Sequence, residues 1–216
     1  MKKIITILLS FLFISFQSVK AEVGIGITGA YHMLDVSGTE TTRQSGEANT
    51  GSHSEDVLVP EVFLEALLDN GGALGVSFIP TRDIGSKSRS DTNSEGDTGT
   101  YKANAELDNV FQLYVDYPFT EAYGATIYGK VGVQHATIVT LESLNSGSTY
   151  PNKDVFGMTI GLGAKGDLPY GNLYYKAEAA FTDFEDYAEN DESGTNNKVE
   201  ADLEDVSVKL SVGYKF

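Results

Sequence analysis

The sequence predicts an all-β fold, an eight-stranded antiparallel up-and-down transmembrane β-barrel. Three observations predict it: eight apolar runs with a period of two, a regular alternation of long and short connections, and a small or polar opposite face on each run. A period of two places alternate side chains on opposite faces of a strand. In chain order the runs are 22–36, 57–68, 73–80, 106–117, 124–139, 154–165, 172–184 and 204–216.

The length and alternation of these runs fit strands that cross a membrane. Most of them reach the roughly 9–11 residues that a tilted transmembrane strand needs. The third run is the shortest and ends at Pro80, which cannot donate to a strand ladder. In the last run Val206, Val208 and Leu210 share one face, and Ser207 and Lys209 lie on the other. Apolar-out, polar-in alternation of this kind is the signature of a transmembrane barrel.

The connections between the runs alternate between long and short. They cover 37–56, 69–72, 81–105, 118–123, 140–153, 166–171 and 185–203, so long and short connections alternate. An up-and-down barrel with an even number of strands places all short turns on the side of both termini and all long loops on the other. A soluble barrel has no reason to sort its loops in this way, so the pattern favours a barrel that spans a membrane.

The first 21 residues are expected to be a cleaved signal peptide, which leaves 22–216 as the barrel domain. Lys2 and Lys3 precede an apolar segment over 4–16, and small residues precede a cleavage site after Ala21. The apolar segment is shorter than the roughly 20 residues of a spanning helix. The chain has no cysteine, so it offers neither a lipid-anchoring residue nor a disulfide.

The charge balance argues against nucleic acid as a partner. The net charge is −16, and loss of Lys2, Lys3 and Lys20 with the leader makes it −19. Nucleic acids are bound by basic surfaces. An acidic balance of this size is typical of solvated loops.

The end of the chain resembles a known signal. In bacterial outer-membrane barrels the chain ends in Phe after apolar or aromatic residues at alternate positions, and the barrel-assembly machinery reads that strand. The residues that fit this pattern are Leu210, Val212, Tyr214 and Phe216.

The domain as a whole is similar in architecture to small barrels of the OmpA transmembrane-domain, OmpX and opacity-protein type. That resemblance covers nearly all of 22–216 and rests on strand number and loop pattern. It implies a location in the bacterial outer membrane, contact with outer-membrane lipid and lipopolysaccharide, and a monomer.

Charged residues on the polar faces are the first candidate site. By parity they point into the lumen, because a charge facing lipid at mid-depth costs roughly 2–4 kcal/mol for a cation. They are Glu61, Glu65, Asp108, Lys130, Lys176, Glu178 and Lys209, of which Glu61, Lys130, Glu178 and Lys209 lie at similar depth. The lumen of eight strands is just wide enough for side chains to fill it. We therefore expect either an ion-paired plug or a gated small-ion path in which the pairs exchange partners.

Acidic loop segments are a second candidate. Residues 91–97 have oxygen donors at alternate positions, as at the start of a calcium loop, but Lys102 stands where the closing Glu would be. Asp186, Glu189, Asp191 and Glu192 form another cluster. These segments are expected either to be solvated loops or to bind divalent cations weakly.

A third candidate lies on the run 124–139. Parity turns His135 and Thr137 outward, with Glu142 five residues after Thr137. Lipid A deacylases have a similar His-x-Ser pair on the outer wall of a barrel, although here Thr137 replaces Ser and Ile138 replaces the following Asn. The alternative is an interfacial histidine. His32 and His53 have no partner at metal-ligand spacing, and no phosphate or dinucleotide motif is present, so we expect no metal and no cofactor.

These features leave three functional hypotheses. The first is a non-enzymatic outer-membrane barrel with a role in envelope integrity or surface interaction, acidic external loops and an ion-paired lumen. The second is a lipid A-modifying enzyme of the deacylase kind. The third is a soluble lipocalin-like binding barrel with its apolar face turned inward, against which the sorted loops, Phe216 and the lack of tryptophan argue.

Overall fold

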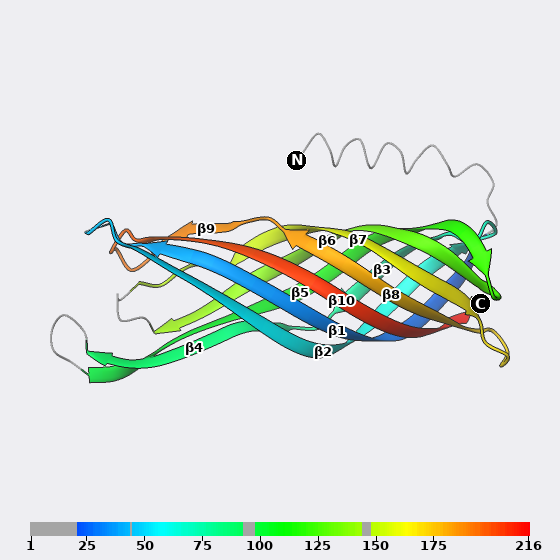
Figure 1. Ribbon diagram of the computed structural model, residues 1–216, viewed down its shortest axis with the longest axis horizontal. Coiled ribbons are helices and arrows are strands. Elements are labelled where there is room, and N and C mark those ends of the chain that lie inside the picture. Colours follow the sequence, from blue (N-terminus) through cyan, green and yellow to red (C-terminus); the bar gives the residue numbers. More distant parts are fainter. Residues whose placement is uncertain (1–20, 44, 93–97, 144–147) are drawn as a thin grey trace, which may run out of the picture.

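A computed structural model shows a single closed antiparallel barrel (Figure 1). The structure describes residues 21–43, 45–92, 98–143 and 148–216, so the predicted signal peptide lies outside the described residues apart from Ala21. The strands are β1 Ala21–Thr41, β2 Ala48–Leu68, β3 Ala73–Ile79, β4 Arg82–Thr92, β5 Thr98–Ala122, β6 Ala125–Ser143, β7 Lys153–Asp167, β8 Leu173–Phe184, β9 Tyr187–Asn190 and β10 Lys198–Lys215.

The ring closes between the first and last strands. Neighbours along the ring are β1, β2, β3, β5, β6, β7, β8 and β10, and β10 pairs back onto β1 from Gly24↔Lys215 to Thr41↔Lys198. β4 also pairs with β5, and β9 with β10, so β4 continues the position of β3 and β9 that of β8. The interruption between β3 and β4 falls at Pro80, as expected for a residue without an amide proton. The predicted eight-stranded barrel is confirmed.

The predicted long loops are wrong in extent, because most of their residues are strand. β1 and β2 remain paired as far as Thr41↔Ala48, and β5 has 25 residues, far more than the roughly 9–11 needed to cross a membrane. On its long-loop side the barrel is therefore longer than a membrane crossing requires. In extensions such as 48–56 both faces are polar, so the apolar alternation that marks a strand is missing there. On β10 the alternation continues with its phase reversed, from Val199 to Leu203.

The short turns lie at the end of the barrel that also holds the C-terminus (Figure 1). One of them is shorter than predicted: β5 reaches Ala122, and only Tyr123 and Gly124 connect it to β6. Both residues have positive φ, 53° and 80°, as in the tight two-residue turns that match the twist of a hairpin.

A bulge in β5 reverses the phase of one predicted face. The pairing with β6 shifts between Asp108 and Phe111, and Asn109 adopts a φ of 52°. As a result Leu107, which has the same parity in the run 106–117 as outward-facing Phe111, is fully buried inside the barrel. Asp108, predicted to face the lumen, instead accepts hydrogen bonds from Thr81 and Asn109 outside the lumen network. An extra residue in a strand flips every side chain on one side of it.

The polarity of the two faces exchanges along the barrel axis. On β10, outward-facing Val208 is followed toward the long-loop end by outward-facing Glu204 and Glu200, while the inward side chains change from Lys209 to Leu203. The strands β1 and β2 change in the same way toward the long-loop end. The outward side chains change from Ile27 to Asp35 on β1 and from Leu64 to Ser54 on β2. The inward side chains change from Thr28 to Leu34 on β1 and from Glu61 to Val59 on β2. The half near the short turns is therefore apolar outside and polar inside, and the half near the long loops is the reverse.

The outer wall of the short-turn half is an apolar belt. Its exposed side chains include Ile27, Leu58, Leu64, Val131, Ile160, Leu162, Val208 and Leu210. A continuous exposed apolar surface of this kind indicates contact with lipid or with another apolar surface. The soluble lipocalin-like alternative is therefore wrong. Among the described residues no helix has the length and hydropathy needed to cross a membrane.

Candidate functional site

The candidate site is the lumen, where the described residues include eleven buried ionisable side chains. They come from eight strands, and they are His32, Glu61, Glu65, Arg82, Asp116, Lys130, Lys165, Lys176, Glu178, Asp205 and Lys209. Burying a charge is costly unless it is paired and hydrogen-bonded. Their pairing therefore decides whether the lumen is stable and whether it is open.

The inner network lies toward the short-turn end and joins four strands. Lys176 on β8 contacts Glu65 on β2 at 2.9 Å and Asp116 on β5 at 2.8 Å. Lys130 on β6 contacts Glu178 at 2.7 Å and Asp116 at 3.2 Å. Each carboxylate in this network thus has at least one ammonium within ion-pair distance.

Tyrosines complete the inner network. The hydroxyl groups of Tyr114 and Tyr174 donate to the Glu65 carboxylate at 2.8 and 2.9 Å. Lys130 lies over the Tyr114 ring, 3.5 Å from its centroid, where a cation is attracted by the face of the ring. These rings fill the width of the barrel.

Glycines on the inward face make room for these rings. A Cβ at Gly75 would lie 2.3 Å from Tyr114, one at Gly163 would lie 2.4 Å from Tyr128, and one at Gly213 would lie 2.3 Å from Tyr174. The glycine-rich polar face of the sequence is therefore the complement of large inward-facing tyrosines.

The outer network lies nearer the long-loop end and is centred on His32. Its Nδ1 is 2.8 Å from an Asp205 oxygen and its Nε2 is 3.1 Å from Glu61 Oε1. Both nitrogens can donate only when the ring carries two protons. Lys209 pairs with Glu61 at 2.8 Å, and Arg82 pairs with Asp205 at 3.1 Å.

Little space remains between the two networks. Glu61, Lys130, Glu178 and Lys209 line a cavity of about 10 Å³, about the volume that one water probe occupies. Beside it, amides and hydroxyls form their own hydrogen-bonded layer, made by Ser77, Gln112, Gln134, Thr159 and Thr182. The mid-depth lumen is thus filled by paired and hydrogen-bonded side chains.

An apolar core fills the lumen beyond the outer network. Its members are Leu34, Val59, Ile79, Ile84, Leu107, Val110, Ala136, Ile138, Tyr150, Val155, Phe184, Tyr187 and Leu203. A polar inner face was predicted for the whole barrel, and for this half the prediction is wrong. The outer wall there faces water, so burial of apolar surface has to occur inside.

The structure brings the four predicted lumen residues into direct pairs, Glu61 with Lys209 and Lys130 with Glu178. Sequence reasoning missed five lumen residues: His32, Arg82, Asp116, Lys165 and Asp205. Parity along their strands places all of these except Arg82 on an inward face, Asp205 among them. Arg82 had no such signal, because it lies in a segment predicted as a loop.

The outward-facing pair on β6 does not form the arrangement of a deacylase site. The Thr137 hydroxyl donates to Asp154 on β7 at 2.7 Å, and the ring of His135 packs edge-on against Phe156 with centroids 5.2 Å apart. The side chain of Glu142 lies outside the described residues. A carboxylate therefore holds the candidate nucleophile rather than orienting the histidine.

The acidic cluster over 186–192 stabilises a turn in the structure. Slight desolvation acts to raise the pKa of Asp191, but hydrogen bonds from the Ser193 hydroxyl and from the backbone amides of Thr149 and Ser193 outweigh it and hold that pKa well below its usual range. Glu189 pairs with Lys153 at 3.1 Å. Within the described ranges no three His, Cys, Asp or Glu side chains are grouped to hold a metal ion, and positions 93–97 of the calcium-like segment lie outside those ranges.

Comparisons with known proteins show which solved structures have a similar fold. No family model matches this chain, and no curated protein sequence matches it. Among solved structures, it is similar to the outer membrane protein OprG from Pseudomonas aeruginosa, with a TM-score of 0.64, 16% identity, and coverage of 91% of this chain and 97% of that one.

Two weaker likenesses accompany it. The outer membrane protein AlkL, solved in DMPC bilayers, has a TM-score of 0.47 at 10% identity and covers 94% of this chain and 93% of its own. The attachment invasion locus protein Ail of Yersinia pestis has a TM-score of 0.40 at 13% identity and covers 88% and 99%. The similarity to OprG shows that the fold of this chain is that of the small outer-membrane β-barrels.

Proposed function

We propose that the mature protein, from Glu22 onward, is a monomeric, non-enzymatic barrel of the bacterial outer membrane with a closed, ion-paired lumen. Its role is in envelope integrity and surface interaction, as in the OmpA, OmpX and opacity-protein type that its sequence resembles. The observation that carries the proposal is the filled mid-depth lumen, where the space between the networks is about 10 Å³. A solute larger than water has no path through it.

Energetics support a plug over an open path. Opposite charges attract more strongly in a lumen from which water is partly excluded, and removal of one partner leaves the other buried and uncompensated. Lys176 and Lys209 each hold a carboxylate at less than 3 Å. To conduct, the barrel has to break several such pairs together with the apolar core.

The wall of the long-loop half supports a surface role. Asp35, Asp183, Glu200, Asp202 and Glu204 project outward there. Desolvation, together with a hydrogen bond and the charge of nearby Asp186, raises the pKa of Asp202. Like charges this close indicate a strongly negative face, which favours cationic groups over anionic ones.

Single-channel recording tests the plug. The purified barrel in a planar bilayer is expected to show no large, steady conductance, only small and infrequent openings. Lys209→Ala removes a partner of Glu61 and is expected to raise the opening frequency, while Lys215→Ala, whose ion pair with Asp167 lies at the rim, leaves it unchanged. Continuous wild-type conduction at porin-like levels contradicts the proposal.

We also propose that the barrel-assembly machinery reads the alternate residues Leu210, Val212, Tyr214 and Phe216. All four face outward, and the rings of Tyr214 and Phe216 contact each other at 5.0 Å. Phe216→Asp is expected to lower the folded yield in outer-membrane fractions far more than Lys215→Ala. Equal folded yields for the two variants remove the basis for this role.

The absence of lipid A-modifying activity is part of the proposal. What supports it is the engagement of the Thr137 hydroxyl by Asp154. The mass spectrum of lipid A from expressing cells is expected to be the same for wild type and His135→Ala. A deacylated species that disappears in His135→Ala and Thr137→Ala makes the protein an enzyme instead.

A further inference from the structure

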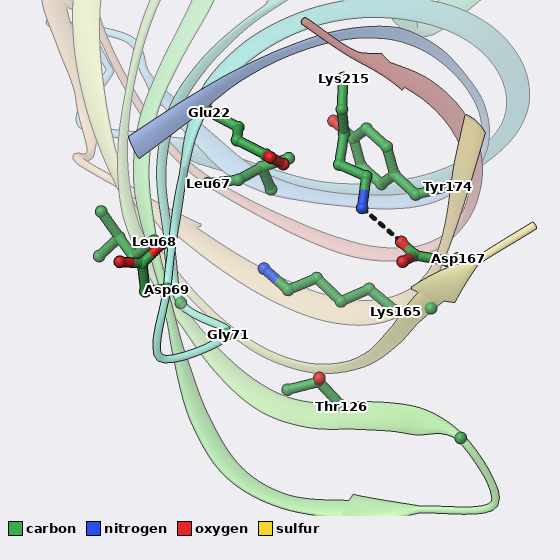
Figure 2. Close-up of a pocket in the computed structure, with 13 residues that line it drawn as sticks. Glu22, Leu67, Leu68, Asp69, Gly71, Thr126, Lys165, Asp167, Tyr174 and Lys215 are labelled. Carbon is green, nitrogen blue, oxygen red and sulfur yellow. Dashed lines mark hydrogen bonds and ion pairs between the residues drawn. The ribbon is translucent and has the colours of Figure 1, made fainter. Parts of the chain in front are cut away.

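The lumen opens into a vestibule at the short-turn end (Figure 2). This cavity has a volume of about 310 Å³, many times the space between the two networks, and lies within the roughly 300–1,000 Å³ typical of ligand pockets. Leu67, Thr126 and Tyr174 line its wall, and Lys165 reaches across it from β7 (Figure 2).

Lys165 is the buried ammonium that the lumen leaves without a hydrogen-bond partner. Its side chain is only 7% exposed, and its Nζ forms no hydrogen bond to any described residue. The nearest aromatic face, that of Tyr128, lies 5.5 Å from the Nζ. By contrast Lys130, Lys176 and Lys209 each pair directly with a carboxylate.

The buried carboxylates are already engaged by other cations. In the outer network Glu61 pairs with Lys209, and Asp205 pairs with Arg82. In the inner network Glu65 and Asp116 pair with Lys176, and Glu178 pairs with Lys130. The second lysine of the vestibule, Lys215, pairs with Asp167 at 2.6 Å. The buried carboxylates of the described lumen equal the buried lysines and arginines in number, but each carboxylate is in contact with a cation other than Lys165. Lys165 therefore places a buried ammonium that no carboxylate contacts at the inner end of a cavity, and a buried charge without a direct partner is costly until an anion reaches it.

We propose that the vestibule is a binding site for a small monocarboxylate that enters from the short-turn side. The carboxylate of the ligand pairs with the Lys165 ammonium after a small rotation of the flexible lysine stem. Its short apolar body lies against Leu67 and the ring of Tyr174, whose hydroxyl is occupied by Glu65.

The rim of the vestibule selects a single negative charge. Glu22 and Asp69 line the mouth and are both exposed. Their carboxylates repel an anion that carries two charges, such as phosphate near neutral pH, more strongly than one that carries a single charge. The site thus excludes multivalent anions while it accepts one carboxylate at Lys165.

The test is an NMR titration of the folded full barrel in micelles with sodium butyrate, read at the backbone amides of Gly124, Thr126 and Gly166. Saturable shifts with a Kd on the order of millimolar are expected. Lys165→Met keeps the stem and removes the charge, and it is expected to weaken binding at least about tenfold, the loss typical of one charge-assisted hydrogen bond. Lys198→Met is the matched control and is expected to change the Kd less than about twofold, because Lys198 begins β10 at the long-loop end, a barrel length away from the vestibule.

Two further probes define the ligand class. Neutral 1-butanol and inorganic phosphate are each expected to bind more weakly than butyrate. Butyrate is also expected to raise the Tm of wild type but not of Lys165→Met, which should itself fold, since the ammonium that it removes makes no hydrogen bond to any described residue.

Several results overturn the site. They are the absence of saturable shifts with butyrate, equal shifts in Lys165→Met, equal binding of butanol, or tighter binding of phosphate. Because none of these measurements depends on conductance, the site can fail while the closed-barrel proposal stands.

Discussion

The two halves of the lumen are filled with opposite chemistry. Near the short turns, buried ions and tyrosines bridge strands that lie far apart in the sequence, as Lys176 does between Glu65 and Asp116. Near the long loops, aliphatic and aromatic residues such as Leu34, Leu107 and Phe184 form a core like that of a soluble protein.

The difference follows from what lies outside the wall. Where the outer face is apolar and suited to lipid, the inner face is free to be polar, because transfer of the strand into lipid already removes apolar surface from water. Where the outer face is acidic and meets water, the inner face has to bury apolar surface instead. The same strands thus have the residue pattern of a membrane barrel at one end and that of a soluble barrel at the other.

The largest expected effect comes from breaking the ionic half. Lys176→Met leaves Glu65 and Asp116 with less compensation in a buried site, and loss of one member of a buried pair costs roughly 3–5 kcal/mol. Urea unfolding of the barrel in lipid vesicles measures this. Lys215→Met, at a partly exposed pair, is expected to cost at most about 1 kcal/mol. Equal costs would show that the inner network is well hydrated.

Truncation of the apolar half is expected to have a similar or slightly smaller effect. Leu107 is fully buried, and Leu→Ala at such a site costs roughly 2–5 kcal/mol. Leu210 faces outward and is 68% exposed, so Leu210→Ala leaves no internal cavity and should cost less. The same unfolding experiment compares them, and a larger loss for Leu210→Ala contradicts the burial of Leu107 in an apolar core.

A lysine scan along β10 locates the point where the outer wall changes from lipid to water. Val208→Lys places a cation in the apolar belt, at a cost of roughly 2–4 kcal/mol if it lies near mid-bilayer. Glu204→Lys lies four residues further on the same face and is expected to change stability within about 0.5 kcal/mol, as at an ordinary surface site. Similar penalties at both positions would place lipid against the acidic wall.

The smallest expected effect is a local pH dependence of the turn over 191–197. Because the pKa of Asp191 is lowered in the folded barrel, its carboxylate stabilises the turn above the unfolded-state pKa of about 3.9, and this stabilisation is lost as the pH falls below it. Amide hydrogen exchange at Thr195, which donates to Asp191, should accelerate at acidic pH beyond its intrinsic change. In Asp191→Asn the additional acceleration should be absent. If wild type and variant exchange alike, the turn does not depend on this charge.

The sequence by itself determined the number of crossing strands, their order and the sorting of short turns. These depend on local features, namely the period of two and residues such as Pro80, that are read without knowledge of contacts. Parity also put Glu61, Lys130, Glu178 and Lys209 on one inward face, where the structure pairs them.

Only the tertiary structure decided where the two faces exchange polarity. Alternation has no absolute phase, so neither the acidic outer face at Glu204 nor the inward turn of Leu203 can be assigned until the surroundings of the wall are known. The bulge at Asn109 acted in the same way, since one additional residue moved Asp108 out of the lumen and Leu107 into it. The partners of His32 and Arg82, and the lack of one for Lys165, depend on the closure of the ring, which brings distant strands across a narrow lumen.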